Sequence, residues 1–233
     1  MTLQDQPILV LGGSSGIGFG VAKAACDAGA RVTIASRSQE KVDAAASKLG
    51  ATGVTLDTGD AEALEAFFAN TSFAHVFCSA ASTKVDAVRS LLLEDAYASV
   101  QSKFWGAYRV ARAASIRDGG SLTLVSGFLS VRPKKGAAIQ GAINAAIEGL
   151  TRGLALELAP VRVNCISPGL IQTEMYDSLD GDGRKAMFDG AAERLPVGRV
   201  GGPEHIATQA IALMSNPYMT GTTVLVDGGG AIA

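Results

Sequence analysis

Short apolar runs alternate with amphipathic stretches along almost the whole chain. The apolar runs are rich in β-branched residues and are bounded by Gly, Ser, Asp or Pro, which is typical of buried parallel strands. Strands are predicted at residues 8–10, 31–35, 53–56, 74–78, 122–125, 161–166 and 222–226. Helices are predicted at residues 19–26, 39–49, 61–69, about 93–115 and about 137–158. The alternation predicts one α/β domain over residues 1–233, with a mostly parallel seven-stranded sheet and helices on both faces.

A glycine-rich turn joins the first predicted strand to the first predicted helix. It contains Gly12, Gly16 and Gly18, and Ser14, Ser15 and Ile17 lie between these glycines. Glycines let the backbone approach a diphosphate closely, and the helix start offers unpaired N–H groups to an anion. The same spacing could be a plain strand-to-helix turn. Its setting favours a phosphate-binding turn in a doubly wound, Rossmann-type fold.

The end of the second predicted strand indicates which dinucleotide the fold prefers. An acidic residue there would bond the ribose hydroxyls of NAD, but this chain has Ser36-Arg37-Ser38. A guanidinium can pair with a 2′-phosphate and two hydroxyls can donate to it, so we predict NADP(H) rather than NAD(H). The alternative is a solvated arginine in a turn. Asp57-Thr58, after the third predicted strand, lies where a side chain could meet the adenine.

Composition excludes several function classes. The net charge of -2 and the absence of any basic cluster beyond Arg132, Lys134 and Lys135 argue against nucleic-acid binding. No apolar run is long enough to span a membrane, and the first six residues lack the features of a signal peptide. The three cysteines and two distant histidines give little support to a metal site. We therefore expect a cytoplasmic protein without a metal centre.

Four motifs together resemble the short-chain dehydrogenase/reductase family, and the likeness extends from Pro7 to Gly229. Residues 11–18 are similar to the family's T-G-x-x-x-G-I-G, with Leu11 in place of threonine. Residues 162–169 are similar to R-V-N-x-I-x-P-G, residues 171–173 to I-x-T, and residues 220–229 to the C-terminal pattern. The resemblance implies a contact from Asp57 to adenine and contacts from the segment with Pro168, Gly169, Ile171 and Thr173 to the nicotinamide end. Ala80 lies in an altered form of the family's N-A-G run.

The resemblance is weakest at the positions where the family has its serine, tyrosine and lysine. Without gaps these fall on Gly127, Gln140 and Asn144, and Ser126 immediately precedes the first. Gln140 can donate a hydrogen bond, but an amide cannot supply a proton at neutral pH. Asn144 could bond a nicotinamide ribose hydroxyl. Ser126 could replace the family's contact to the substrate oxygen, or could be purely structural.

Lys103 occupies the position of an active-site asparagine of the family. A lysine that points into the site would restore a cation, and semi-burial would lower its pKa towards neutrality, which suits a general acid. The alternative is that its side chain extends to solvent.

The segment at about 174–195 corresponds to the family's lid over the substrate, which is a small molecule. The glycines at positions 181, 183 and 190 suit a mobile lid. Its aromatic and methionine residues could line the pocket or pack on the sheet, and candidates for the lining are Met175, Tyr176, Met187, Phe188, Phe128 and Trp105. The resemblance also implies a homodimer or homotetramer paired through the long helices.

Three functions are compatible with these observations. The first is an NADP(H)-dependent oxidoreductase with an altered proton-transfer site at Lys103, Ser126, Gln140 and Asn144. The second is a catalytically inactive NADP(H)-binding sensor or partner subunit. The third is a non-redox enzyme that reuses the same pocket.

Overall fold

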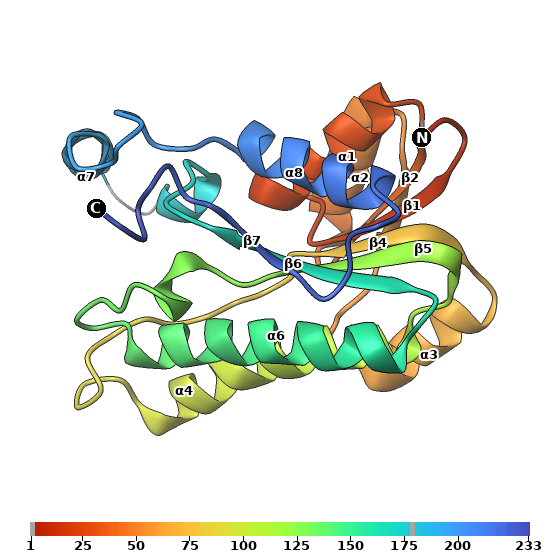
Figure 1. The fold of residues 1–233 in the computed structure, drawn as a ribbon, viewed down its shortest axis with the longest axis horizontal. Helices are drawn as coiled ribbons and strands as arrows, with labels where there is room; N and C mark the ends of the chain where they lie inside the picture. Colours follow the sequence, from red (N-terminus) through yellow and green to blue (C-terminus); the bar gives the residue numbers. More distant parts are fainter. Residues whose placement is uncertain (1–2, 178–179) are drawn as a thin grey trace.

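A computed structural model describes residues 3–177 and 180–233 of the chain. Its centre is a seven-stranded sheet with the order β3-β2-β1-β4-β5-β6-β7, in which every neighbouring pair is parallel (Figure 1). The strands are β1 (Pro7–Leu11), β2 (Arg31–Ser36), β3 (Thr52–Thr55), β4 (Phe73–Cys78), β5 (Ile116–Val125), β6 (Arg162–Pro168) and β7 (Thr223–Val226). The predicted seven-stranded parallel sheet is therefore confirmed.

Helices cover both faces of the sheet, with α1, α2 and α8 above it and α3, α4 and α6 below it in Figure 1. The helices are α1 (Gly16–Asp27), α2 (Gln39–Leu49), α3 (Ala61–Ala69), α4 (Leu93–Val100), α5 (Gly106–Ala113), α6 (Ala138–Glu157), α7 (Gly181–Ala192) and α8 (Pro203–Ser215). Local chemistry fixes several ends. Asp60 caps α3 by accepting a hydrogen bond from the Ala63 N–H at 3.0 Å.

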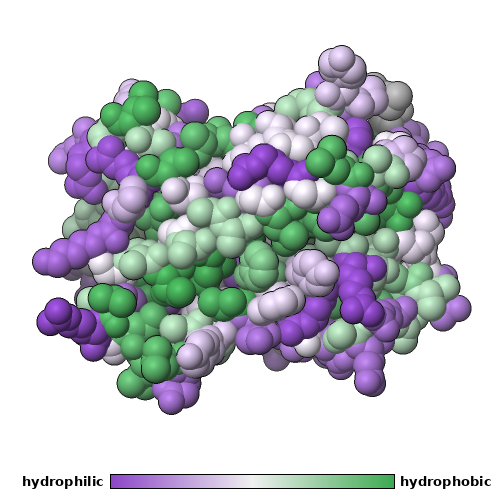
Figure 2. All heavy atoms as spheres, turned by 60° about the horizontal axis from the view of Figure 1, so that its bottom comes forward, coloured by the Kyte–Doolittle hydropathy of each residue, from purple (hydrophilic) through white to green (hydrophobic). Residues whose placement is uncertain are grey.

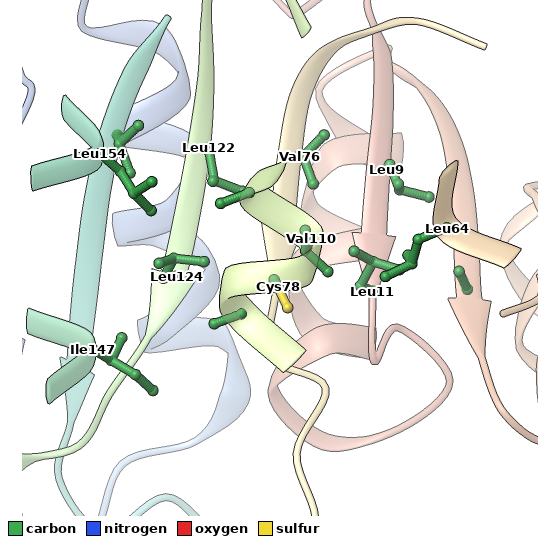
Figure 3. Packing of buried hydrophobic residues seen from close by; sticks show 14 of the residues in the cluster. Leu9, Leu11, Leu64, Val76, Cys78, Val110, Leu122, Leu124, Ile147 and Leu154 are labelled. Carbon is green, nitrogen blue, oxygen red and sulfur yellow. The ribbon is translucent and has the colours of Figure 1, made fainter. Parts of the chain in front are cut away.

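Alternating side chains of the strands build two separate cores. Leu9 and Leu11 of β1 point into the core under α3, α5 and α6, whereas Ile8 and Val10 of the same strand point into the core under α1 and α8. Figure 3 shows the first of these cores. Because strand side chains alternate between the faces, a strand covered on both sides is apolar throughout. The resulting rigid sheet fixes the loops at its carboxyl edge.

The structure differs from the sequence-based expectation around residues 93–115. The predicted single helix is divided into α4 and α5 by a π-helical segment, η1 (Gln101–Trp105). Such a wide turn contains one residue more than an α-helical turn, so it changes the direction of the side chains within it. Lys103 lies in this segment. The sequence analysis also missed α8 and the early start of β5 at Ile116.

Candidate functional site

The glycine-rich turn lies where the strand order reverses, between β1 and β4. Gly12 has φ +81°, and a Cβ there would lie 2.7 Å from the Ala80 backbone nitrogen. A Cβ on Gly18 would overlap the backbone oxygen of Gly12. The turn and the segment after β4 are thus in direct backbone contact, and Ala80 lies beside the turn as expected. In doubly wound sheets this crevice is the usual position of a ligand.

The start of α1 binds an anionic oxygen within the protein itself. The helix begins after Ser15, whose side chain makes no capping bond, and the Gly16 N–H donates to Oε2 of Glu174 at 2.9 Å. Ser14 and Ile17 are half-buried beside it. This carboxylate occupies the kind of position that a phosphate oxygen takes at a helix start. The donor set of the turn therefore fits a dinucleotide diphosphate. The sequence analysis did not identify Glu174.

The charged residue predicted to bind the adenosine end of the dinucleotide lies at the surface. Arg37 is exposed and makes no hydrogen bond or ion pair to any residue that the structure describes. Ser36 and Ser38 flank it, and the Ser38 hydroxyl accepts the Lys41 N–H at 3.4 Å as the cap of α2. That bond leaves the hydroxyl hydrogen of Ser38 free to donate. The arrangement is compatible with a 2′-phosphate.

The residues after β3 divide into one exposed and one buried position. Asp57 is exposed, and its Oδ1 accepts the Gly59 N–H at 2.8 Å, which leaves the other carboxylate oxygen open. Thr58 is 7% exposed, and its hydroxyl lies against Gly106 at the start of α5. Asp57 can meet an adenine at the surface, whereas Thr58 connects this loop to α5.

The predicted nicotinamide segment follows β6. Pro168 ends the strand, and the Gly169 N–H donates to the Val226 carbonyl at 3.0 Å. Ile171 is buried and pairs with Gly201 in an isolated parallel bridge. Thr173 lies against Gly16, where a Cβ would be 3.3 Å from its methyl group. The structure thus brings the predicted nicotinamide segment onto the glycine-rich turn.

Lys103 points into the protein, not into solvent. Its Nζ donates to Oδ1 of Asn144 at 2.7 Å and to the backbone carbonyl of Ser126 at 2.7 Å. Asn144 is 2% exposed and lies on α6, so the lysine connects η1, β5 and α6. The ammonium therefore bonds the side chain of Asn144, the residue at which the resemblance places the family's lysine. Asn144 is engaged by Lys103 through its side-chain oxygen.

Burial lowers the pKa of Lys103. Desolvation lowers the pKa of Lys103 to about 8, against the raising effects of Cys165 and Glu148. Burial also raises the pKa of the Cys165 thiol, which keeps that thiol neutral at pH 7. An ammonium with a pKa close to neutrality can give up its proton to a reacting group and take one back.

Ser126 and Gln140 differ from Lys103 in their partners. Ser126 is 4% exposed, and its hydroxyl donates to Oε1 of Glu148 at 2.9 Å, so it faces α6. Gln140 lies one turn before Asn144, and its Oε1 is buried with no partner among the described residues. Glu148 also accepts the Ser130 hydroxyl at 2.6 Å. The sequence analysis missed Glu148, although its position one turn after Asn144 could have indicated it.

The predicted lid at 174–195 forms a short turn, η3 (Glu174–Tyr176), and α7. Residues 178 and 179 and the side chain of Met175 lie outside the described residues. Tyr176 and Phe188 pack edge to face with ring centroids 5.5 Å apart.

Trp105 is not positioned to line the pocket. It packs on Tyr108 and lines a surface groove with Glu62 and Glu65 of α3. Trp105 is two positions after Lys103 in η1, which places the two side chains on different sides of the helix.

Among the described residues, no helix has the length and apolar character needed to cross a bilayer. Within those residues there is also no cluster of three His, Cys, Asp or Glu side chains that could hold a metal ion.

Comparisons with known proteins agree with this geometry. Residues 12–230 match the family model described as Enoyl-(Acyl carrier protein) reductase. The chain is 34% identical over 256 residues to the short-chain dehydrogenase/reductase ucsE of Acremonium sp. This alignment covers 99% of the chain and 97% of that protein.

Two solved structures are similar over the full fold. A small-chain dehydrogenase in complex with NADPH has a TM-score of 0.86 and 36% identity, over 99% of this chain and 100% of that one. The MalC reductase/Diels-Alderase from Malbranchea aurantiaca has a TM-score of 0.90 and 25% identity, over 100% of this chain and 98% of that one.

Proposed function

Because the chain belongs to the short-chain dehydrogenase/reductase family of oxidoreductases, we propose that it is an NADP(H)-dependent oxidoreductase whose proton-transfer site is built on Lys103. The observation on which the proposal depends most is the pair of hydrogen bonds from the Lys103 ammonium to Asn144 and to the Ser126 carbonyl. These bonds direct a cation inward near the end of β5, next to the strand from which the predicted nicotinamide segment starts.

The preference for NADP(H) is supported by the charges around the turn. Gly12, Gly16 and Gly18 leave room for a diphosphate, and the exposed Arg37 can pair with a 2′-phosphate. No carboxylate follows β2 within the stretch Ser36-Arg37-Ser38. The similar small-chain dehydrogenase in complex with NADPH gives the same preference by analogy.

The residues around Lys103 can hold and move a proton. When bound, the nicotinamide supplies hydride to, or accepts it from, a carbon of the substrate. Asn144 and the Ser126 carbonyl accept two of the three ammonium hydrogens, and no other described residue is bonded to the third. That hydrogen can bond a substrate oxygen on which negative charge develops and can then be transferred to it. Gln140 adds an amide that can orient a small-molecule substrate but cannot give up a proton.

The substrate need not be a simple carbonyl compound. Hydride transfer to an iminium or to an activated alkene makes a smaller demand on a proton donor than carbonyl reduction does. A non-redox reaction in the same pocket is a second candidate, since one similar structure is that of the MalC reductase/Diels-Alderase. A catalytically inactive NADP(H) sensor is the third.

Binding and turnover of Lys103→Ala distinguish these functions. NADPH and NADH affinities are measured by nicotinamide fluorescence, and turnover is measured with panels of carbonyls, iminium ions and activated alkenes. We expect turnover to fall about 100-fold or more, typical of removing a general acid, with NADPH affinity within about two-fold of the original. Lys48→Ala, an exposed lysine of α2, is the matched control.

The other outcomes separate the alternatives. Unchanged turnover in Lys103→Ala would exclude the role of Lys103. NADPH binding without turnover of any acceptor by the unaltered protein would favour the sensor. Absence of binding of either dinucleotide would exclude both cofactor-based functions and leave the non-redox enzyme.

We also propose that the protein is cytoplasmic and forms a homodimer or homotetramer. Figure 2 shows apolar side chains gathered in a band on the face formed by the lower helices of Figure 1. Leu93 and Tyr97 of α4 are 68% and 66% exposed, and Leu156 of α6 is 83% exposed. Such a face is typical of an interface between copies of one chain. Sedimentation at micromolar concentration should give a dimer or tetramer and not a species of 23.7 kDa.

A further inference from the structure

Glu148 lies next to the Lys103 site but has no place in the function proposed above. It is half-buried on α6, one helical turn after Asn144, so both side chains project from the same face of the helix. Its Oε1 accepts hydrogen bonds from the Ser126 hydroxyl at 2.9 Å and from the Ser130 hydroxyl at 2.6 Å. The two hydroxyl donors hold the Glu148 side chain in place on this face of the helix.

The contacts of Glu148 continue to Lys103 through a single residue. Ser126 donates its hydroxyl to Glu148 and accepts the Lys103 ammonium with its backbone carbonyl at 2.7 Å. Lys103 also bonds Asn144, which precedes Glu148 by one turn of the same helix. Glu148, Ser126, Lys103 and Asn144 therefore form a chain of hydrogen bonds between α6, the residue after β5 and η1. Through Ser126, the position of Glu148 is coupled to the carbonyl that accepts the ammonium.

The charges around Lys103 also indicate a role for Glu148. Desolvation lowers the pKa of Lys103 to about 8, and Cys165 on β6 and Glu148 on α6 are the two groups that oppose this effect. The pKa of Cys165 is itself raised by burial, so the thiol is uncharged at neutral pH. Glu148 is then the carboxylate, among the described residues, whose charge opposes the desolvation of Lys103.

We propose that Glu148 is a positioning residue for Lys103, which fixes Ser126 by hydrogen bonding and keeps the ammonium protonated by its charge. The proposal rests on the proposed function, because it assigns importance to the protonation of Lys103. A purely structural Glu148 would connect α6 to the end of β5 without affecting the titration of the lysine. The two roles differ when the charge is removed and the hydrogen-bond acceptor is kept.

Glu148→Gln makes that change, because an amide oxygen still accepts from both serines. The titration of Lys103 is followed by NMR on protein with isotopically labelled lysine side chains, with Lys103→Ala used to assign the signal. We expect the pKa of Lys103 in Glu148→Gln to fall by on the order of one unit, the usual effect of losing an adjacent opposite charge. Glu157→Gln, an exposed residue at the end of the same helix, is the control and should cause no shift.

The pH dependence of turnover provides a second readout. Activity that requires protonated Lys103 falls as the pH rises through the pKa of this lysine, so Glu148→Gln should move that fall to lower pH by the same amount. NADPH affinity should stay within about two-fold, because Glu148 is not part of the glycine-rich turn. Ser126→Ala removes the hydroxyl link and keeps the charge, so it should lower turnover and leave most of the Lys103 titration unchanged.

The results distinguish failure of this proposal from failure of the proposed function. If Lys103→Ala loses turnover while Glu148→Gln leaves both the lysine titration and the pH profile unchanged, the positioning role is wrong and the proposed function stands. If Lys103→Ala keeps full turnover, the proposed function is wrong even where Glu148→Gln shifts the titration.

Discussion

The turn after β1 and the cluster around Lys103 lie at the same edge of the sheet, yet they are specified in different ways. The turn is defined by backbone: Gly12 and Gly18 are in contact with other backbone atoms, so no side chain fits there. The Lys103 cluster is defined by the tips of side chains from η1, β5 and α6. A site made of backbone needs particular residues at particular positions. A site made of side-chain tips needs a group at a point in space, and a different helix can supply it.

The largest effect on NADPH affinity is expected from adding a side chain to a glycine of the turn. Gly18→Ala places a Cβ onto the backbone oxygen of Gly12, so the turn must shift and the diphosphate donors with it. We expect NADPH affinity to fall by roughly 100-fold or more, equivalent to about 3 kcal/mol. Gly153→Ala on α6 is the control, because a Cβ there meets nothing within 4 Å, and it should bind NADPH normally. An unaltered affinity in Gly18→Ala would show that the turn does not bind the dinucleotide.

A smaller and more selective effect is expected at Arg37. Its guanidinium is exposed and has no partner among the described residues, so its removal should not disturb the fold. Arg37→Ala should weaken NADPH binding by about 10- to 100-fold, typical of losing a charge-assisted bond to phosphate, and leave NADH binding unchanged. Fluorescence titrations with both dinucleotides measure this ratio. An equal loss for the two would contradict the assignment of Arg37 to the 2′-phosphate.

The same contrast explains what the sequence predicts well. The spacing of Gly12, Gly16 and Gly18 follows from backbone geometry that varies little within the fold, so the turn, its neighbouring strands and the sheet are predictable from the residues. The resemblance draws attention to Lys103, but the sequence leaves open whether its side chain points inward or to solvent, and only the hydrogen bonds to Asn144 and Ser126 show that it points inward.

Other features depend on how distant segments meet. Glu174 and Gly16 are 158 residues apart in the chain, and no local pattern indicates their hydrogen bond. Helix periodicity alone predicted an unbroken helix at about 93–115, and it does not indicate the π-helical segment η1. Glu148 is one of several polar residues on α6, and only its serine partners, Ser126 after β5 and Ser130 of η2 (Phe128–Ser130), distinguish it.

The buried ammonium should also leave a signature in stability. Folding lowers the pKa of Lys103 from 10.5 to about 8. The unfolded chain therefore binds more protons between these pH values, and the contribution of this group to stability increases as the pH rises through that window. Relative to Lys103→Met, the original protein should gain on the order of 2 kcal/mol in the free energy of unfolding between pH 8 and pH 10. Urea unfolding at several pH values tests this, and a difference independent of pH would show that the lysine titrates normally.

The smallest effect concerns a contact that links the glycine-rich turn to the predicted lid segment. The Glu174 carboxylate accepts the Gly16 N–H at 2.9 Å, and a dinucleotide diphosphate needs donors at the same helix start. An exposed anion at a helix N-terminus gains about 0.3–1 kcal/mol, so its loss should raise NADPH affinity about two- to five-fold in Glu174→Gln. Glu193→Gln, at the end of α7, makes the same change in net charge away from the turn and should have no effect. Because the competition is between two anions for one donor, the gain should diminish as salt is added. Weaker NADPH binding in Glu174→Gln would instead mean that Glu174 supports the turn in its bound state, and the backbone site would then depend on a side chain after all.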